Sequence, residues 1–315
     1  MCHLFICGTL LQARIAESII KANRLPASEC ATFFYANRKT EQYCHYFDRL
    51  SHFCDKSMLF FADGHTAKSL FQAKKALKSI RFKHVYLASP ISAYSIIALG
   101  LGRHTALYTF DDGTANIFPI STYSKGYKLS VKKSVALKIL GSFYTPARIK
   151  AESIGHYTIY PHFKNNISDK LIPIELFSPP PKPRLDLKCS VILGTVFHEV
   201  FDYDRPRVVL GKIESLFKKT NHDIFFLRHP RDRLPDLNHF QKIDTSLMAE
   251  DAVLELLFHY SEIDLYGFCS SAQVNLAHIQ RINPVLIKTV EYEDSYNEMA
   301  QLFETMNRSF KTLEL

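Results

Sequence analysis

"HLFICGTLLQARIAESIIKA", residues 3–22, joins a short apolar run to a helical pattern through Gly8 and Thr9. The run at 3–7 has the length and composition of a buried strand, and the residues after Thr9 repeat apolar positions at helical spacing. The same order of strand, break and helix recurs along the chain, with predicted strands at 84–88, 190–193, 223–227 and 263–268. This repetition predicts an α/β fold in which helices cover both faces of parallel sheets.

A proline-rich stretch interrupts this pattern. SPPPKPR, residues 178–184, holds four prolines in seven residues, and such a segment can be neither helix nor central strand. A chain of 315 residues is long enough for two domains. We therefore predict one doubly wound domain at 1–178, a linker at 179–184 and a second doubly wound domain at 185–315. Ligands of such folds bind at the carboxyl ends of the strands.

The composition excludes several classes of protein. With 47% apolar and 22% charged residues, the chain is typical of a globular protein rather than a disordered one. No apolar run reaches the roughly 18 residues of a membrane span. The opening residues lack a basic region and a small-residue cleavage site, so we expect no signal peptide. The seven cysteines show no paired or zinc-type spacing, which favours free thiols in a reducing cytoplasm and no metal.

The net charge of +8 is unevenly distributed. Residues 1–150 carry 21 Lys and Arg against 8 Asp and Glu, a balance of +13, whereas residues 151–315 carry 18 against 23, a balance of −5. The basic half suggests a polyanionic partner: a nucleic acid, an anionic membrane face or a phosphorylated glycolipid. The alternative is a solvated surface that keeps the protein in solution. No helix-turn-helix or other nucleic-acid-binding motif is visible, which disfavours a non-enzymatic nucleic-acid-binding protein.

The segment 66–83 is predicted to form an amphipathic helix. Its apolar face would hold Leu70, Phe71, Leu77 and Ile80, with Lys68, Lys74, Lys75 and Lys78 largely elsewhere. Two interpretations stay open: a helix packed on its sheet with a lysine-rich outer face, or a contact with a membrane surface. Five further lysines between residues 125 and 138 add to the same charge.

Two adjacent carboxylates follow a predicted strand in LYTFDDGTANIF, residues 107–118. The side chains of Asp111 and Asp112 point in different directions, so we expect one to face a substrate and the other to anchor the loop. Gly113 allows the turn, and a simple Asx-type turn is the alternative interpretation. The pair Asp202 and Asp204 forms a D-x-D tripeptide, which is common by chance and which we do not interpret as a metal site.

The second half places polar residues after its predicted strands. Gly194 and Thr195 follow one strand, His229, Pro230 and Arg231 the next, and Ser270 and Ser271 a third. Histidine, arginine and a hydroxyl-rich helix start can hold a phosphate. The alternatives are a surface turn at 228–233 and plain helix capping at 270–271. Glu250 and Asp251 begin a predicted helix, where they offset its dipole or accept hydrogen bonds from a ribose.

Taken in order, these pieces resemble one family. FDDGT-N (110–116), HYTIY-FKN (156–165), an I-L-G strand end (192–194), HPR (229–231), ED (250–251) and the serine pair (270–271) are similar to the bacterial lipooligosaccharide sialyltransferases, glycosyltransferase family 52. CGTLLQARIAE (7–17) is similar to the family's opening. The resemblance implies a GT-B fold, in which two Rossmann-like domains face each other across a cleft, the N-terminal domain on the acceptor side and the C-terminal domain binding the CMP-sugar.

The resemblance also implies the activity. It implies an inverting, metal-independent transfer of sialic acid from CMP-sialic acid to a terminal galactose of a lipooligosaccharide. The same resemblance implies a homodimer, in which some family members exchange N-terminal segments between subunits, and a cytoplasmic location, peripheral on the inner face of the bacterial inner membrane. A transferase that uses another nucleotide-activated sugar, such as another CMP-ulosonic acid, is the alternative within the same fold.

Carried over by position, the resemblance assigns roles to residues of this sequence. His229 becomes the candidate acid on the leaving phosphate. The simplest aligned position for the base holds Phe197, so Glu199, Asp111 and Asp112 stay open as the base. The residues expected to bind the donor are Thr9, Gln12, Gly113, Gly194, Thr195, Pro230, Arg231, Glu250, Ser270 and Ser271.

Overall fold

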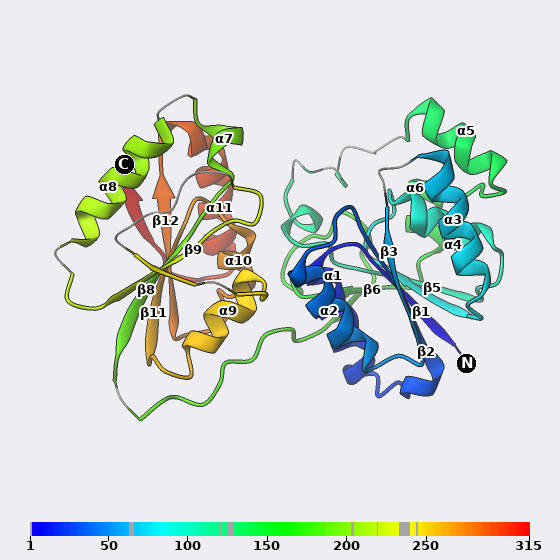
Figure 1. The fold of residues 1–315 in the computed structure, drawn as a ribbon, viewed down its shortest axis with the longest axis horizontal. Coiled ribbons are helices and arrows are strands. Elements are labelled where there is room, and N and C mark those ends of the chain that lie inside the picture. Colours follow the sequence, from blue (N-terminus) through cyan, green and yellow to red (C-terminus); the bar gives the residue numbers. More distant parts are fainter. Residues whose placement is uncertain are drawn as a thin grey trace. The chain divides into compact units, whose positions relative to one another are not determined.

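The computed structural model describes residues 2–62, 66–119, 121, 123–124, 129–184, 186–202, 205–218, 220–232, 240–243 and 245–315. The chain forms two compact units, Met1–Leu176 and Phe177–Leu315, each built on a parallel sheet (Figure 1). The predicted α/β class is therefore confirmed. Lys125, Lys128 and Asp204, which the sequence singled out, lie outside the described residues.

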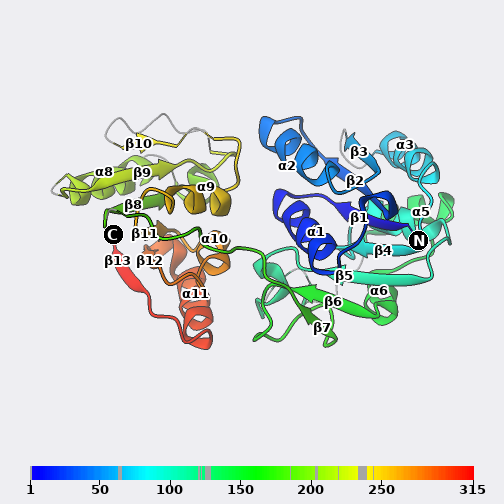
Figure 2. The same cartoon turned by 90° about the horizontal axis from the view of Figure 1, so that it is seen from below.

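The first unit contains a seven-stranded sheet of order β3-β2-β1-β4-β5-β6-β7. Its strands are β1 (His3–Cys7), β2 (Cys30–Ala36), β3 (Lys56–Phe61), β4 (His84–Leu87), β5 (Ala106–Phe110), β6 (Gly155–Thr158) and β7 (Leu171–Pro173). All pair in parallel, and Figure 2 shows their order across the sheet. The order reverses between β1 and β4, and this reversal is the point at which ligands bind in doubly wound sheets.

Helices cover both faces of this sheet. They are α1 (Leu10–Ala22), α2 (Glu41–Ser51), α3 (Ala67–Lys78), α4 (Ala93–Gly100), α5 (Val131–Ile139) and α6 (Pro146–Glu152). Helices α1 and α2 lie on one face, and α3, α4 and α6 on the other (Figure 1). The hydroxyl of Thr9 accepts a hydrogen bond from the backbone N–H of Gln12 (3.2 Å) and so caps the start of α1.

The amphipathic helix predicted at 66–83 forms as α3, but its apolar face is narrower than predicted. Leu70, Leu77 and Ile80 are at most 3% exposed and pack into the core. Phe71 is 62% exposed, so its assignment to the buried face was wrong. Each residue turns a helix by about 100°, which places Phe71 a quarter turn beyond Leu70 and outside the contact with the sheet.

The second unit contains a six-stranded sheet of order β10-β9-β8-β11-β12-β13 (Figure 2). Its strands are β8 (Lys188–Leu193), β9 (Asp223–Leu227), β10 (Gln241–Lys242), β11 (Glu262–Gly267), β12 (Ile282–Lys288) and β13 (Lys311–Glu314). Its helices are α7 (Phe197–Val200), α8 (Arg205–Phe217), α9 (Ala249–Leu256), α10 (Ser271–Asn275) and α11 (Glu293–Thr305). Helix α8 packs on one face through Val209 and Ile213, while α9, α10 and α11 lie on the other (Figure 1).

The segment that joins the units packs on the second one. Phe177 is 1% exposed, and its carbonyl oxygen lies 2.7 Å from Nε2 of His278. The carbonyl oxygen of Pro180 accepts a hydrogen bond from Nη1 of Arg281 (3.0 Å). The division between the units thus falls at residue 177, close to the predicted linker, and the carbonyls of Phe177 and Pro180 contact side chains of the second unit. None of the helices in the described part of the chain combines the length and the apolar character of a membrane span.

Candidate active site

Three neighbouring strands bring polar loops together at one edge of the second sheet. Strand β8 pairs in parallel with both β9 and β11, so their carboxyl ends meet at the same edge. The residues that follow them are Gly194 and Thr195 after β8, His229 to Arg231 after β9, and Ser270 and Ser271 after β11. The structure therefore brings together seven of the predicted site residues, which is the arrangement expected of a ligand site in this fold class.

The imidazole of His229 has a defined orientation. The backbone N–H of Arg231 donates to Nδ1 of His229 (3.2 Å), which leaves Nε2 to carry the proton of the neutral ring. Burial lowers the pKa of His229 below its ordinary value of 6.5, and the nearby charge of Arg231 lowers it further. His229 is thus a neutral hydrogen-bond donor at neutral pH.

Gly194 permits the close approach of β8 and β9 beside this histidine. Its N–H donates to the carbonyl of Leu227 (2.8 Å). A Cβ atom at position 194 would lie 3.1 Å from the backbone nitrogen of His229 and 3.2 Å from the carbonyl oxygen of Leu227. Any larger residue would therefore push the backbone of the His229 loop away from the strand.

Glu199 lies on α7 beside the same loop. Its carboxylate forms an ion pair with Nη1 of Arg231 (3.0 Å), and the two side chains are 47% and 63% exposed. Phe197, at the position where the family resemblance suggested a base, is fully buried and packs against Phe201 and Phe268. Glu199 is therefore the exposed carboxylate of α7, and it is paired with Arg231.

Thr195 has a partner that the sequence did not reveal. Its hydroxyl lies 2.6 Å from the hydroxyl of Tyr292, which follows β12 and packs against Phe201 and Phe268. The two residues are 97 positions apart, and no motif or periodicity joins them. Tyr292 adds a hydroxyl group to this edge of the sheet.

The serine pair begins α10 in a capping box. The hydroxyl of Ser270 accepts from the N–H of Ala272 (3.3 Å), while the N–H of Ser270 donates to Oε1 of Gln273 (3.3 Å). Nε2 of Gln273 donates in turn to the carbonyls of Leu265 and Val285. The capping interpretation is confirmed for Ser270, and phosphate binding by Ser270 and Ser271 stays a prediction.

The side chain of Glu250 is buried rather than exposed at the surface. It is 5% exposed, and its Oε1 accepts a hydrogen bond from Nδ2 of Asn275 (2.6 Å). The contact ties α9 to α10 and so helps to fix the helix that Ser270 caps. Ribose binding by Glu250 stays a prediction.

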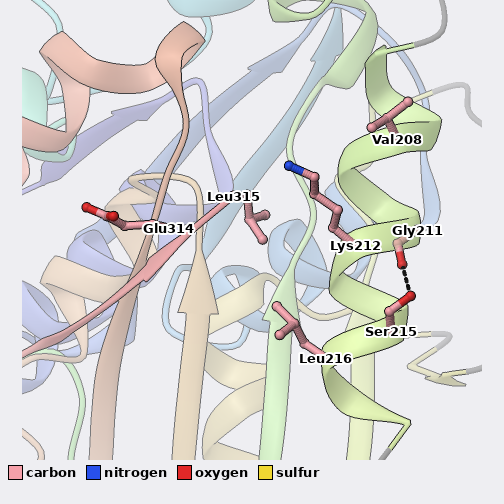
Figure 3. Close-up of a pocket in the computed structure, with 7 residues that line it drawn as sticks. All are labelled: Val208, Gly211, Lys212, Ser215, Leu216, Glu314 and Leu315. Carbon is pink, nitrogen blue, oxygen red and sulfur yellow. Dashed lines mark hydrogen bonds between the residues drawn. The ribbon is translucent and has the colours of Figure 1, made fainter.

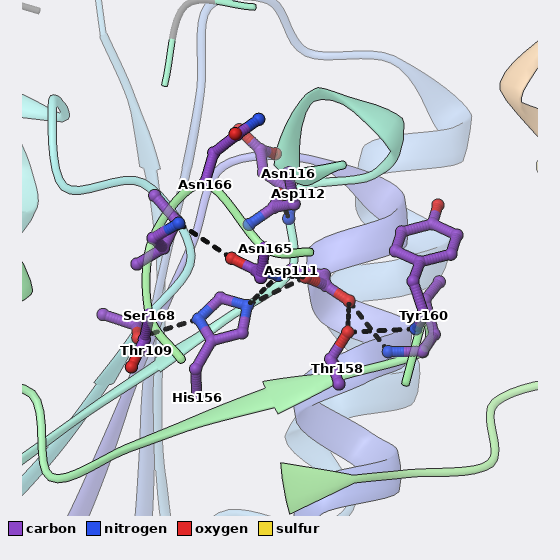
Figure 4. Close-up of polar contacts among 12 residues, drawn as sticks. Thr109, Asp111, Asp112, Asn116, His156, Thr158, Tyr160, Asn165, Asn166 and Ser168 are labelled. Carbon is purple, nitrogen blue, oxygen red and sulfur yellow. Dashed lines mark hydrogen bonds and ion pairs between the residues drawn. The ribbon is translucent and has the colours of Figure 1, made fainter. Parts of the chain in front are cut away.

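The two adjacent carboxylates of the first unit have different surroundings. Asp111 follows β5 and is fully buried. Its Oδ1 accepts from Nδ2 of Asn165 (3.1 Å) and lies 2.8 Å from Nε2 of His156. Its Oδ2 accepts from the hydroxyl of Thr158 (2.7 Å), as Figure 4 shows, and from the N–H of Ile159 (2.8 Å). Because Asp111 has no exposed surface in this structure, we interpret it as the residue that anchors the loop, and a role as the base stays a prediction.

Asp112 occupies the other side of the same turn. Its backbone N–H donates to Oδ1 of Asn116 (2.8 Å). Its Oδ1 accepts from Nε2 of Gln12, and its Oδ2 accepts from the hydroxyl of Tyr123 (2.6 Å). Burial raises the pKa of Asp112 above 3.8, against the effect of these two hydrogen bonds. A carboxylate with a raised pKa is a better proton acceptor near neutral pH.

Thr9 and Gln12 lie with Asp112 in the first unit. Oε1 of Gln12 accepts from the N–H of Gly8 (2.6 Å), so the same side chain that donates to Asp112 is fixed at both ends. Gly113 has φ +96°, a conformation that a side chain would strain, and it makes the turn after Asp112. Gln12 and Gly113 thus lie beside the carboxylate, Thr9 caps the helix that carries Gln12, and all three predicted donor-binding residues belong to the first unit.

A surface pocket of about 560 Å³ lies elsewhere on the second unit, between α8 and the end of β13 (Figure 3). It is lined by Val208, Gly211, Lys212, Ser215, Leu216, Glu314 and Leu315. None of the predicted site residues lines this pocket, so it carries no argument about the reaction.

Comparison with known proteins identifies the family. The model of glycosyltransferase family 52 matches residues 28–291. The chain belongs to this family and is a glycosyltransferase. It is 29% identical, over 96% of its length and 97% of the relative, to the CMP-N-acetylneuraminate:beta-galactoside alpha-2,3-sialyltransferase of Pasteurella multocida (strain Pm70). It is 26% identical to the N-acetyllactosaminide alpha-2,3-sialyltransferase of Haemophilus influenzae, over 91% of the chain and 92% of the relative.

Solved structures support the fold alone. The glycosyltransferase SnogD from Streptomyces nogalater is similar with a TM-score of 0.52 and 12% identity, over 100% of this chain and 86% of that one. The UDP co-structure of MnaA from S. aureus is similar with a TM-score of 0.54 and 9% identity, over 98% and 89%. The expected GT-B fold is confirmed by these likenesses.

Proposed function

We propose that this family 52 glycosyltransferase transfers sialic acid from CMP-sialic acid to the galactose of a β-galactoside in α2,3 linkage. The observation that carries the proposal is the similarity, over nearly the whole chain, to relatives named as α2,3-sialyltransferases. The polar edges of the two sheets support the proposal. The edge of the second sheet, around His229, offers hydrogen-bond donors for a phosphate, and the edge of the first sheet offers the carboxylate of Asp112, whose pKa is raised.

In the proposed reaction the second unit acts on the donor. CMP-sialic acid is a β-glycoside and the product is an α-glycoside, so one in-line displacement inverts the anomeric centre. Negative charge grows on the phosphate of CMP as the glycosidic bond breaks. The Nε2–H of His229 donates to that phosphate, and Arg231 and the hydroxyls of Ser270 and Ser271 stabilise the same charge. Gly194, Thr195, Pro230 and Glu250 shape the nucleotide side of this site.

In the proposed reaction the first unit acts on the acceptor. Asp112 takes the proton of the attacking galactose hydroxyl as the new bond forms. Gln12 and Tyr123 hold its two oxygens, and Asp111 fixes the turn from which it projects. Glu199 is the competing base, because it is exposed beside His229, but its carboxylate is already paired with Nη1 of Arg231 (3.0 Å).

We further propose a lipooligosaccharide as the natural acceptor, metal independence, a homodimer, and a cytoplasmic position on the inner face of the bacterial inner membrane. The family resemblance suggests all four, and the +13 balance of residues 1–150 favours a polyanionic surface as a neighbour. The fixed donors around His229 can stabilise the departing phosphate in the way that a divalent ion does in other transferases.

The test is a transfer assay with the purified chain. CMP-sialic acid is incubated with lactose in the presence of EDTA, and CMP release and the linkage of the product are measured. We expect release that depends on lactose, is undiminished by EDTA, and yields an α2,3-linked product. Release with a different CMP-ulosonic acid alone would favour the alternative donor, and loss of activity in EDTA that Mg²⁺ restores would contradict metal independence.

A further inference from the structure

Helix α5 presents an apolar stripe away from the core. Val131, Val135 and Ile139 are 79%, 50% and 80% exposed, and their spacing of four residues places them on one side of the helix. The opposite side is held firmly: Leu137 is 2% exposed in the core, and Nζ of Lys133 donates to the carbonyl of Ile91 (3.0 Å). The exposed stripe is therefore a property of the folded unit and not of a poorly packed helix.

Two further exposed phenylalanines lie on the segments next to this stripe, one after α5 and one on α3. Phe143 follows α5 and is 67% exposed, and Phe71 on α3 is 62% exposed. Nζ of Lys74 on α3 donates to the carbonyl of Leu140 at the end of α5 (2.5 Å), which joins the two helices. Phe71 lies three residues before Lys74, on the same side of α3. We call Val131, Val135, Ile139, Phe143 and Phe71 the α3–α5 surface.

The charge of the segment that carries this surface is mostly positive. Between residues 64 and 152 the chain has fourteen Lys and Arg residues and three acidic residues, Asp111, Asp112 and Glu152, and Glu152 forms an ion pair with Nε of Arg148 (2.6 Å). Asp111 is fully buried, and both oxygens of Asp112 accept hydrogen bonds within the fold. The exposed lysines of the two helices are Lys68, Lys75, Lys78, Lys132 and Lys138. Apolar side chains bordered by an excess of lysines match a surface of anionic headgroups above an apolar interior.

A second copy of the chain is a poor match for the same surface. A symmetric dimer would bring the same patch of both copies together, and the lysines of one copy would face those of the other. An anionic bilayer offers negative charge and an apolar layer at once. We propose that the α3–α5 surface docks on an anionic lipid bilayer, with Val131, Ile139, Phe143 and Phe71 inserted at the headgroup level and the lysines among the headgroups.

The docking proposal deepens the proposed function, because a lipid-linked acceptor is anchored in such a bilayer. The two are tested separately. Binding of the chain to vesicles needs neither CMP-sialic acid nor an acceptor, and transfer to lactose needs no membrane. If the chain binds vesicles but releases no CMP with lactose, the proposed function is rejected and the docking stands. If it releases CMP with lactose but does not bind vesicles, the docking is rejected and the proposed function stands.

The experiment is cosedimentation of the full chain with vesicles of phosphatidylcholine, with and without phosphatidylglycerol. We expect binding that requires phosphatidylglycerol and falls as salt is raised. The double variant I139S/F143S should lower binding on the order of tenfold or more through lost apolar contact, and K132E/K138E should do the same through lost charge. All four side chains are exposed, so circular dichroism and transfer to lactose should stay unchanged.

The matched control removes two apolar side chains of similar exposure elsewhere. Val208 and Leu216 on α8 are 49% and 50% exposed and line the pocket of Figure 3. V208S/L216S should bind vesicles as the unmodified chain does. Equal binding by I139S/F143S and the unmodified chain, equal binding to vesicles without phosphatidylglycerol, or a wild-type dimer in solution that I139S/F143S dissociates would each overturn the docking proposal.

Discussion

The backbone N–H of Arg231 points at Nδ1 of His229 from 3.2 Å and so decides which ring nitrogen carries the proton. With Nδ1 used as an acceptor, the proton of the neutral ring resides on Nε2. Burial and the charge of Arg231 keep the pKa of His229 below 6.5, so the neutral ring dominates at neutral pH. The histidine can then stabilise a departing phosphate by donating a hydrogen bond, without giving up its proton.

Replacing His229 tests this role. His229→Ala should lower kcat for CMP release on the order of 100-fold or more, the effect typical of removing one donor to a developing charge. His229→Gln carries an amide N–H near the position of Nε2 and should recover about a tenth of the lost activity or more. KM for CMP-sialic acid should change less than kcat. Turnover near normal in His229→Ala would reject the assignment.

Paired amide variants distinguish the two candidate bases. Asp112→Asn should lower kcat by a factor of about 100 to 10,000, the range found for general bases, while the fold survives. Glu199→Gln should cost about tenfold or less, because it removes one exposed ion pair with Arg231. The opposite ranking in the same assay would assign the base to Glu199.

The pH dependence of kcat/KM follows from Asp112. A base must be deprotonated, so activity should fall as the pH drops through the pKa of Asp112, which lies above 3.8. The hydroxyl of Tyr123 donates to this carboxylate and lowers its pKa. Tyr123→Phe should therefore raise the pKa and move the acid limb of the profile to higher pH. A limb that does not move in Tyr123→Phe would remove Asp112 from the role.

The neutral state of His229 leads to a second prediction about the pH profile of kcat/KM. If the ring acts as a neutral donor, kcat/KM should not decline as the pH rises from 6.5 to 8, since no proton is lost in this range. The measurement is the pH profile of the unmodified chain with lactose. A decline with rising pH that His229→Gln abolishes would instead show that the imidazolium is the active form.

The ion pairs of Glu17 indicate how the stability of the first unit should depend on pH. Its side chain is 3% exposed and accepts from Nε of Arg49 (2.6 Å) and Nζ of Lys21 (2.5 Å). Burial raises the pKa of Glu17, but the hydrogen bonds from Arg49 and Lys21 outweigh it and lower the pKa from 4.5 to about 2. The charged form thus stabilises the fold at neutral pH, and this contribution is lost as the pH falls from 4.5 toward 2.

Glu17→Gln should accordingly lower the free energy of unfolding by about 2–3 kcal/mol at pH 7, because Arg49, Lys21 and Arg14, whose Nη1 lies 3.0 Å from Oε2 of Glu17, lose their charged partner. The difference from the unmodified chain should shrink below pH 4. Urea unfolding of both proteins at a series of pH values measures it, with Arg148→Gln, which breaks an exposed ion pair with Glu152, as the control. A constant difference across the series would show that the charge of Glu17 is not its cause.

The fold could be predicted from the sequence because the patterns that indicate strands and helices are local. The apolar run 3–7, the break at Gly8 and Thr9 and the helical spacing after them are contiguous, and the structure forms β1 and α1 there. The gathering of His229 with Gly194 and Ser270 was also predictable, since parallel strands end at one edge. Phe71 was assigned to the wrong face because a helical pattern locates the centre of an apolar face better than its border.

Contacts between residues far apart in the sequence could not be predicted from local sequence patterns. Tyr123 reaches Asp112 across a turn without periodicity, and Tyr292 reaches Thr195 from the end of another strand. The adjacency of Asp111 and Asp112 suggested different roles but not which residue had which. That choice depends on His156, Thr158 and Asn165, whose side chains meet Asp111 only in the folded sheet.

The hydrogen bonds to the buried carboxylate of Asp111 couple the evolution of several positions. Loss of the carboxylate would remove the partner of the Asn165 amide and the His156 ring inside the protein, and loss of either of them would leave Oδ1 of the buried Asp111 with one partner fewer. Evolution can therefore change these sites only as a set. In an alignment of family 52 chains, positions 111, 156 and 165 should covary, whereas position 199 on the surface should drift on its own.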